Sequence, residues 1–289
     1  VFKKLILARQ KIIGFDNFEQ GKKRYYFETN FYQPSLQYLI KPNGLITPDN
    51  ITNHKALHSQ EKTTEYLEKM FQYYDIKFDL SEYKIIDEPV ENNTAKIAAK
   101  LASEDKIKII VKGHIHTDVL MKEVLKREYG LLGKKRLSHI WHMTLEKDDK
   151  PLIITDGALN VNPNVKTKMH ILRNVIDFCH RINIPKPKIS ILSATEEVLD
   201  SMQSSLDAKE ITNLAAKEGF NADIFGPLAF DNSISKKSAG IKGIKNIVAG
   251  DADVLLVPNV ETGNALVKMM IYFMGACAAG VVVGGKVPV

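Results

Sequence analysis

Short apolar runs alternate with stretches of helical periodicity from about residue 60 onward, and this alternation constrains the fold more than any other feature. The runs predicted to form strands are residues 107–111, 152–155, 189–192, 254–257 and 279–283. The stretches predicted to form helices are residues 63–73, 94–102, 118–127, 165–182, 208–218 and 265–274. Strands and helices that alternate in this way form a mostly parallel sheet with helices on both faces, so we expect an α/β fold.

The chain has 289 residues, which is enough for about two domains of ~150 residues each. We therefore expect two three-layer αβα domains with mostly parallel sheets and an interdomain cleft that holds the ligand. The first domain is predicted to comprise residues 1–150 and the returning strand at 279–289, and the second residues 151–278. Residues 1–60 do not follow the alternation and are atypical.

The net charge of +6 and the pI of about 9.0 would suit an anionic partner. Residues 1–50 carry eight Lys and Arg against four Asp and Glu, so most of the excess charge lies there. Nine of the 23 aromatic residues lie in the first 40 residues, interleaved with basic ones, a mixture that single-stranded nucleic acid binders use. A small packed hairpin explains this composition better, because no RNP, KH or zinc-finger pattern accompanies it. We expect no nucleic-acid partner.

The cysteine pattern and the longest apolar run favour a cytoplasmic protein without a membrane span. Cys179 and Cys277 lack metal-site or redox spacing and are expected to be buried structural thiols. Residues 269–285 are uncharged over 17 positions, but they contain four glycines and divide into a helix and a strand. A membrane span needs ~20 apolar residues. The first residues are basic and lack a small-residue cleavage site, so no secretory signal is expected.

Polar residues follow several of the predicted strands, where α/β enzymes place their ligands. The candidate substrate-binding residues are Lys112, Gly113, His116, Thr117, Asp156, Asn160, Asn162, Asp231, Asn232, Gly263 and Asn264. Loop packing is the alternative for the histidines, and plain turn chemistry for the Asx-rich loop. Gly263 and Asn264 are expected to head a helix whose free amides suit an anion. Residues 193–197 are expected to cap a helix, with a phosphate cradle as the alternative.

Several motifs occur in one order along the chain. They are DLSEYKIIDEP at 79–89, IIVKGHIHTDVLMKEVL at 109–125, RLSHIWHM at 136–143, LIITDGALNVNP at 152–163, ILSATE at 191–196, GPLAFDNSIS at 226–235 and AGDADVLLVP at 249–258. Together with the Gly263-Asn264 pair, this series resembles the phosphate acetyltransferase and phosphate butyryltransferase family. The resemblance covers about residues 79–289.

The resemblance implies transfer of an acetyl or other short acyl group between coenzyme A and inorganic phosphate, with acyl-CoA and phosphate as partners. It implies neither a metal nor a cofactor, and it suggests a homodimer. Tyr272 and Phe273 replace arginines of the acetyl-type enzymes and are closer to the butyryl-type pattern. The reaction needs a thiolate, donors aimed at the oxyanion, and cations or helix amino ends for the phosphates.

The catalytic residues themselves are not assigned. In the family, a Ser-Arg pair and an acid follow the strand that corresponds to residues 279–289, and they are expected beyond Val289. Because groups that act together lose most of the rate when one is removed, a chain without them is expected to be severely impaired. The alternative function is therefore an inactive member that retains coenzyme A binding or subunit association.

Overall fold

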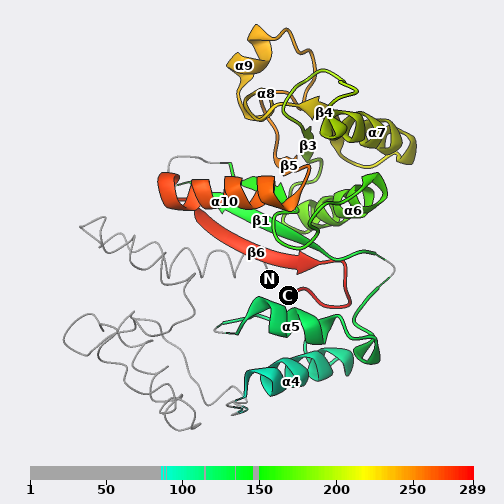
Figure 1. The fold of residues 1–289 in the computed structure, drawn as a ribbon, viewed down its shortest axis with the longest axis vertical. Helices are drawn as coiled ribbons and strands as arrows, with labels where there is room; N and C mark the ends of the chain where they lie inside the picture. The colour runs from blue at the N-terminus through cyan, green and yellow to red at the C-terminus, as the bar shows by residue number, and fades with distance from the viewer. Residues whose placement is uncertain (1–85, 87, 89, 114, 134, 146–149) are drawn as a thin grey trace, which may run out of the picture. The chain divides into compact units, whose positions relative to one another are not determined.

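The computed structural model describes residues 86, 88, 90–113, 115–133, 135–145 and 150–289 (Figure 1). The chain divides into two compact units, one of Leu7–Leu131 and one of Val1–Ile6 with Leu132–Val289. The helix predicted at 63–73, the aromatic segment at 1–60 and the motif at 79–89, apart from Ile86 and Glu88, lie outside the described residues.

The described part of the first unit is helical. It contains α4 (Glu91–Ser103), α5 (Thr117–Val124) and the short 3-10 helix η5 (Arg127–Tyr129). The alanines of α4 at spacings of three and four are fully buried, and α4 contacts α5. The strand predicted at 107–111 is wrong, because this segment is irregular and pairs with no strand of the described residues. Ile110 is buried there, whereas Val111 is 71% exposed.

The second unit is built on one six-stranded sheet. Its strands are β1 (Ser138–Thr144), β2 (Leu152–Thr155), β3 (Lys188–Leu192), β4 (Asp223–Leu228), β5 (Val254–Leu256) and β6 (Cys277–Val283). Their order in the sheet is β4-β3-β5-β2-β1-β6. The pairs from β4 to β2 are parallel, and β1 is antiparallel to both β2 and β6. The expected α/β fold with a mostly parallel sheet is confirmed.

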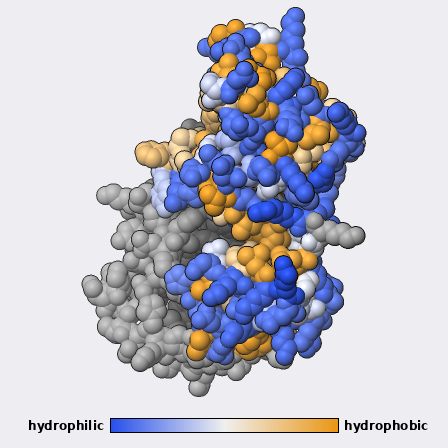
Figure 2. Space-filling model, turned by 45° about the vertical axis from the view of Figure 1, so that its right-hand side comes forward, coloured by the Kyte–Doolittle hydropathy of each residue, from blue (hydrophilic) through white to orange (hydrophobic). Residues whose placement is uncertain are grey.

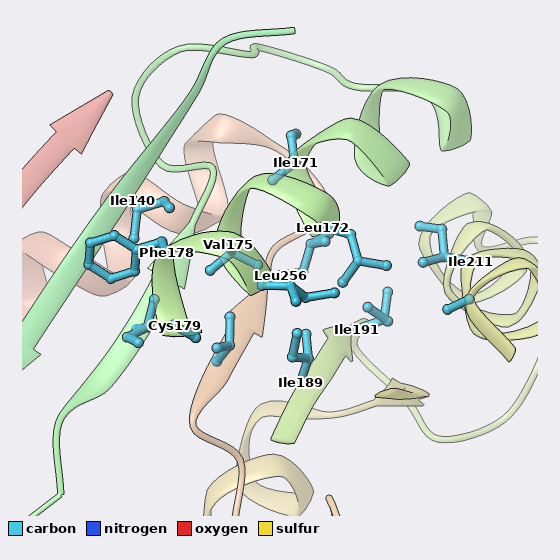
Figure 3. Packing of buried hydrophobic residues seen from close by; sticks show 14 of the residues in the cluster. Ile140, Ile171, Leu172, Val175, Phe178, Cys179, Ile189, Ile191, Ile211 and Leu256 are labelled. Carbon is cyan, nitrogen blue, oxygen red and sulfur yellow. The ribbon is translucent and has the colours of Figure 1, made fainter. Parts of the chain in front are cut away.

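Helices cover both faces of this sheet. They are α6 (Val165–Arg181), α7 (Gln203–Glu218), α8 (Phe230–Ile234), α9 (Lys236–Ile241) and α10 (Val260–Met274). One core cluster joins α6 and α7 to the strands, with Leu172 and Val175 beside Leu256 (Figure 3). A second cluster joins α10 to the opposite face, where Ile154 packs with Val267. Successive side chains of a strand point to opposite faces of the sheet, so the strands contribute to both core clusters. The helices on each face and the sheet between them form three layers.

The four strands and three helices that were predicted in this unit lie close to the observed ranges, whereas α8 and α9 were not predicted. The strands predicted at 152–155, 189–192, 254–257 and 279–283 correspond to β2, β3, β5 and β6, and β1 and β4 were not predicted. The predicted domain boundary at residue 150 stays a prediction. In the structure, β1 shares the sheet with β2 and β6, and the compact unit begins at Leu132. A second sheet and an interdomain cleft also stay predictions.

The apolar run at 269–285 divides as expected. α10 ends at Met274, Gly275 follows in the left-handed conformation, and β6 begins at Cys277. None of the helices in the described part of the chain is long and apolar enough to cross a membrane. Cys179 is fully buried in the α6 core, and burial raises the pKa of its thiol to about 12. Its side chain is therefore a structural thiol, as predicted, whereas Cys277 was predicted to be buried and is only partly buried.

Some apolar side chains of this unit are exposed. Figure 2 shows hydrophobic patches between hydrophilic ones at the top of the molecule, where Figure 1 places α8 and α9. Ile241 is 77% exposed and Ile247 is 61% exposed. Exposed apolar residues scattered among lysines are usual on folded proteins, so they do not define a ligand site.

Candidate functional site

The carboxyl ends of the parallel strands all lie at one edge of the sheet. β2 ends at Thr155, β3 at Leu192 and β5 at Leu256. β1 runs in the opposite direction, with Ile140 opposite Thr155, so the residues that precede β1 reach the same edge. Ligands of α/β sheets bind beyond such an edge.

Asp156 follows β2 and shapes its own loop. Its side chain is buried, with 2% exposure. Oδ1 accepts hydrogen bonds from the amides of Ala158 and Leu159, both at 3.0 Å. Oδ2 accepts from the amide of Asn160 at 3.3 Å. This is the turn chemistry that the sequence left open, and it makes Asp156 a residue that positions others. Asn162, farther along the loop, is exposed.

Asn160 connects Asp156 to Arg136, which was not among the predicted site residues. The Asn160 side chain is buried, and its Nδ2 donates to Asp156 Oδ2 at 2.6 Å and to the carbonyl of Leu137 at 2.9 Å. Its Oδ1 accepts a hydrogen bond from Nε of Arg136 at 2.9 Å. Arg136 is exposed. The signal that could have found it is a basic residue directly before a strand in the RLSHIWHM motif.

The backbone of Arg136 is also held in place. Its carbonyl accepts from Nδ2 of Asn174 on α6 at 2.8 Å, and the same nitrogen donates to Oγ of Ser138 at 2.9 Å. Gly284, after β6, has a φ of +100°, and a Cβ atom there would lie 2.6 Å from the Arg136 carbonyl oxygen. Glycine therefore lets the chain after β6 pass against the start of β1.

His139 on β1 lies near this network. Its ring centroid is 4.6 Å from that of Trp141, and a Cβ atom on Gly280 would lie 2.8 Å from the ring. Burial lowers the pKa of His139 from 6.5 to about 4, and the charge of Asp156 opposes the shift. Nδ1 is shielded from solvent and has no hydrogen-bond partner among the residues that the structure describes. The imidazole is therefore neutral near pH 7.

Gly263 and Asn264 do not head their helix, so the reason for expecting an anion at that point is wrong. α10 begins at Val260, and its N-cap is Asn259. The Gly263 amide donates to the Asn259 carbonyl at 3.3 Å, and the Thr262 amide donates to Asn259 Oδ1 at 3.0 Å. These amides are satisfied within the helix start. Gly263 is buried and Asn264 partly exposed, and substrate binding by either stays a prediction.

Asp231 and Asn232 lie on α8, directly after β4. Asp231 is exposed, whereas Asn232 is 1% exposed. Asn232 Nδ2 donates to Oε2 of Glu196 at 3.3 Å, and its Oδ1 has no partner in the described part of the chain. Glu196 pairs with Lys242 at 2.7 Å, and this hydrogen bond lowers the Glu196 pKa. Asn232 is thus joined to the loop after β3.

The cap expected at residues 193–197 is wrong. α7 begins only at Gln203, and its N-cap, Met202, makes no side-chain cap hydrogen bond. Ser193 Oγ is instead 2.9 Å from Oγ of Ser204 in the first turn of that helix. The loop between β3 and α7 is therefore longer than the sequence suggested. Hydrogen bonds between Leu199 and Ser205 also hold this loop.

The remaining candidates belong to the first unit. Lys112 and Gly113 are exposed, and Lys112 Nζ donates to the Gly113 carbonyl at 3.3 Å. His116 is the N-cap of α5, and its Nδ1 lies 2.7 Å from Oε1 of Glu91 on α4. The His116 amide also donates to Glu91. Thr117 begins α5. The convergence of these residues with the sheet edge stays a prediction.

Comparison with known proteins identifies the family. The model of the phosphate acetyl/butaryl transferase family matches residues 40–289. The chain belongs to this family. The phosphate acetyltransferase of Rickettsia felis is 40% identical over 213 residues, which are 73% of this chain and 61% of that protein. The phosphate butyryltransferase of Clostridium acetobutylicum is 34% identical over 215 residues, which are 74% of this chain and 71% of that protein.

Solved structures of this transferase family agree with the fold. A branched-chain phosphotransacylase from Enterococcus faecalis has a TM-score of 0.67 at 34% identity and covers 74% of this chain and 76% of its own. A phosphotransacetylase from Streptococcus pyogenes has a TM-score of 0.59 at 20% identity and covers 83% and 68%, respectively, which shows the fold alone. This chain spans less than two thirds of the length of the Rickettsia relative.

Proposed function

We propose that this protein transfers a short acyl group between coenzyme A and inorganic phosphate. A phosphate oxygen attacks the thioester carbonyl, the carbon–sulfur bond breaks, and acyl phosphate and coenzyme A are the products. The observation that carries the proposal is the match of the transferase family model to residues 40–289. The names of the relatives, which are phosphate acetyltransferases and butyryltransferases, support it.

The sheet edge is suited to anionic substrates. Both substrates carry phosphate groups, and phosphates bind where cations and backbone donors are oriented in advance. Asp156 and Asn160 form a buried support there, and Arg136 is an exposed cation beside it. Such preorganisation matters because an oriented donor stabilises developing charge without reorganising during the reaction.

The roles of the other candidate residues are also proposals. Lys112, Gly113, His116 and Thr117 are proposed as substrate-binding residues of the first unit. Among the described residues, no group of three or more His, Cys, Asp or Glu is arranged to hold a metal ion. We propose chemistry that uses side-chain and backbone donors with coenzyme A and phosphate as substrates. The homodimer and the cytoplasmic location also remain proposals.

We propose acetyl as the preferred acyl group, with butyryl as the alternative. The Rickettsia felis relative, which is 40% identical, is named an acetyltransferase, and the Clostridium acetobutylicum relative, which is 34% identical, is named a butyryltransferase. Tyr272 and Phe273 favour the longer chain. They are 43% and 89% exposed on α10, so the described residues do not enclose them around an acyl group.

The test is acyl transfer by the purified protein from acyl phosphate to coenzyme A, followed by the thioester absorbance. Acetyl phosphate and butyryl phosphate are compared at equal concentration, with a heat-unfolded sample as the control. Thioester formation that depends on phosphate-linked acyl donor and on folded protein supports the proposal. A folded protein that forms no thioester contradicts it. Calorimetry with coenzyme A then distinguishes an inactive coenzyme A binder from a protein that does not bind it.

A further inference from the structure

We infer that Arg136 is an anion-binding residue that holds a phosphate group at the carboxyl edge of the sheet, and that Asn160 and Asp156 position its guanidinium. The inference rests on the proposed function in one respect, namely that the phosphate group belongs to a substrate of the transfer reaction. Arg136 was not among the predicted candidates, and Asp156 and Asn160 were predicted to contact substrate directly.

The guanidinium of Arg136 is held at one side only. Nε donates to Oδ1 of Asn160 at 2.9 Å. An arginine has five N–H donors, so four remain on its two terminal nitrogens. Among the described residues, no carboxylate forms an ion pair with Arg136, and its side chain is exposed. The positive charge therefore remains available to an anion from solution.

The partner of Arg136 has a fixed orientation. Both N–H donors of Asn160 are used, one by Asp156 Oδ2 at 2.6 Å and the other by the Leu137 carbonyl at 2.9 Å. A rotated amide would place two donors against Arg136 and an oxygen against two acceptors. Oδ1 must therefore face the arginine. Asp156 in turn is held by three backbone amides of its own loop.

A second arginine of the same unit shows what a structural role looks like. Arg173 on α6 forms a two-point ion pair with Glu218 on α7, and its Nε donates to Glu218 Oε2 at 3.0 Å. A carboxylate neutralises that guanidinium. Arg136 is instead supported by the neutral amide of Asn160, which orients the guanidinium without forming an ion pair with it. This arrangement suits a site whose anion arrives and leaves with each turnover.

The position of Arg136 agrees with this role. It precedes β1, whose start lies at the edge where β2 ends, and Gly284 after β6 passes against its carbonyl. Parallel α/β sheets bind their ligands beyond this edge. A planar guanidinium can bind two oxygens of a phosphate group at once, and both substrates of the proposed reaction carry phosphate, so we assign the ligand as a phosphate group. Inorganic phosphate and the phosphates of coenzyme A both supply it.

The test measures phosphate binding directly, without enzymatic activity. Phosphorus NMR line broadening of inorganic phosphate is titrated with the wild-type protein and with Arg136→Gln, Arg136→Lys and Arg181→Gln. Arg181 ends α6, and its guanidinium is a matched exposed control. We expect about tenfold weaker binding for Arg136→Gln, because charge-assisted two-point hydrogen bonds are lost. Arg136→Lys should fall between, and Arg181→Gln should match the wild type.

A parallel titration with adenosine 3′,5′-bisphosphate distinguishes the two sources of the phosphate group. Weakened binding of either ligand in Arg136→Gln supports the inference and identifies the source. Asn160→Ala, with its fold checked by circular dichroism, should weaken the same ligand about threefold, because the guanidinium keeps its charge and loses its orientation. Equal binding of both ligands by wild type and Arg136→Gln, or no binding by wild type, overturns the inference.

The outcome is separable from that of the proposed function. If acyl transfer occurs and the KM values of Arg136→Gln for phosphate and acyl-CoA equal those of the wild type, the function stands and the inference fails. If the wild type performs no transfer but binds phosphate through Arg136, the inference stands and the proposed function fails. A rise in the phosphate KM with little change in kcat is the result expected when both hold.

Discussion

The Cα atom of Gly157 lies 2.7 Å from the position that a Cβ atom on Gly263 would occupy. The same Cβ atom would lie 3.0 Å from Cγ2 of Val257 and 3.2 Å from the Asp156 carbonyl oxygen. The first turn of α10 therefore rests directly on the loop that follows β2. That loop contains Asp156 and Asn160, so α10 packs against the segment that supports Arg136.

Gly263→Ala should destabilise this unit by about 1 to 3 kcal/mol, because the methyl group has no space without movement of backbone. Gly240→Ala on α9 is the matched control, since its Cβ would meet nothing within 4 Å. Urea denaturation of both variants measures the difference in free energy of unfolding. Equal stability of the two variants would contradict the close packing of α10 on the loop.

The carboxylate of Asp251 should make stability depend on acid pH. Its hydrogen bond to Lys188, together with Lys150, lowers its pKa from 3.8 to about 2. A lowered carboxylate pKa contributes stability that is present above pH 3.8 and is lost as the pH falls toward 2. We expect about 1 kcal/mol, because the group is partly exposed and solvent screens the pair.

Unfolding midpoints of the wild type and Asp251→Asn between pH 2 and pH 5 test this pH dependence. Asp200→Asn is the control, because Asp200 is exposed and has no ion pair within the described residues. The wild type should lose its advantage over Asp251→Asn as the pH falls. Parallel pH profiles for all three proteins would show that the Lys188 contact contributes no net stability.

His139 should remain neutral to about pH 4, because burial lowers its pKa to that value. The unfolded chain takes up a proton nearer pH 6.5, so the folded state loses stability as the pH falls from 6.5 toward 4. NMR titration of the imidazole, assigned with His139→Gln, measures the pKa. His139→Gln should also reduce the pH dependence of stability in that window. An imidazole that titrates near pH 6.5 would refute the burial.

The ion pair between Lys168 on α6 and Asp207 on α7 is buried, with side-chain exposures of 5% and 12% and a separation of 2.7 Å. Lys168→Met should cost about 3 to 5 kcal/mol, because Asp207 keeps an uncompensated charge beside Gln203. The double variant Lys168→Met with Asp207→Leu should recover at least half of that loss. Thermal unfolding of Lys168→Met, Asp207→Leu and the double variant measures this coupling, and losses that simply add would mean that the two side chains are not coupled.

The sequence predicted the elements whose burial pattern is simple. β2, β3 and β5 are short apolar runs, and α6 has apolar residues at spacings of three and four, so both periods were visible. β1 was missed because histidines interrupt its apolar residues, and β4 because glycine and proline lie within it. The segment at 107–111 has the composition of a strand but no partner strand among the described residues.

The residues of the candidate site were likewise predicted only in part. The loop after β2 was predicted from its Asx residues, and the structure places Asp156 and Asn160 together there. Arg136 was missed because it is 24 positions from Asn160 in the sequence, and no local pattern records their hydrogen bond. The amino end of α10 was misplaced because Asn259, the true cap, precedes the Gly263-Asn264 pair.

The amino-acid sequence by itself determined the α/β class and the family, because hydrophobic periodicity and ordered motifs are local properties of the chain. Only the tertiary structure decided which polar residues meet. The antiparallel direction of β1 brings Arg136 to the edge where β2 ends, and the close approach of Gly157 and Gly263 holds α10 against that loop. Both depend on contacts between distant segments, which are set by packing and hydrogen bonding in three dimensions.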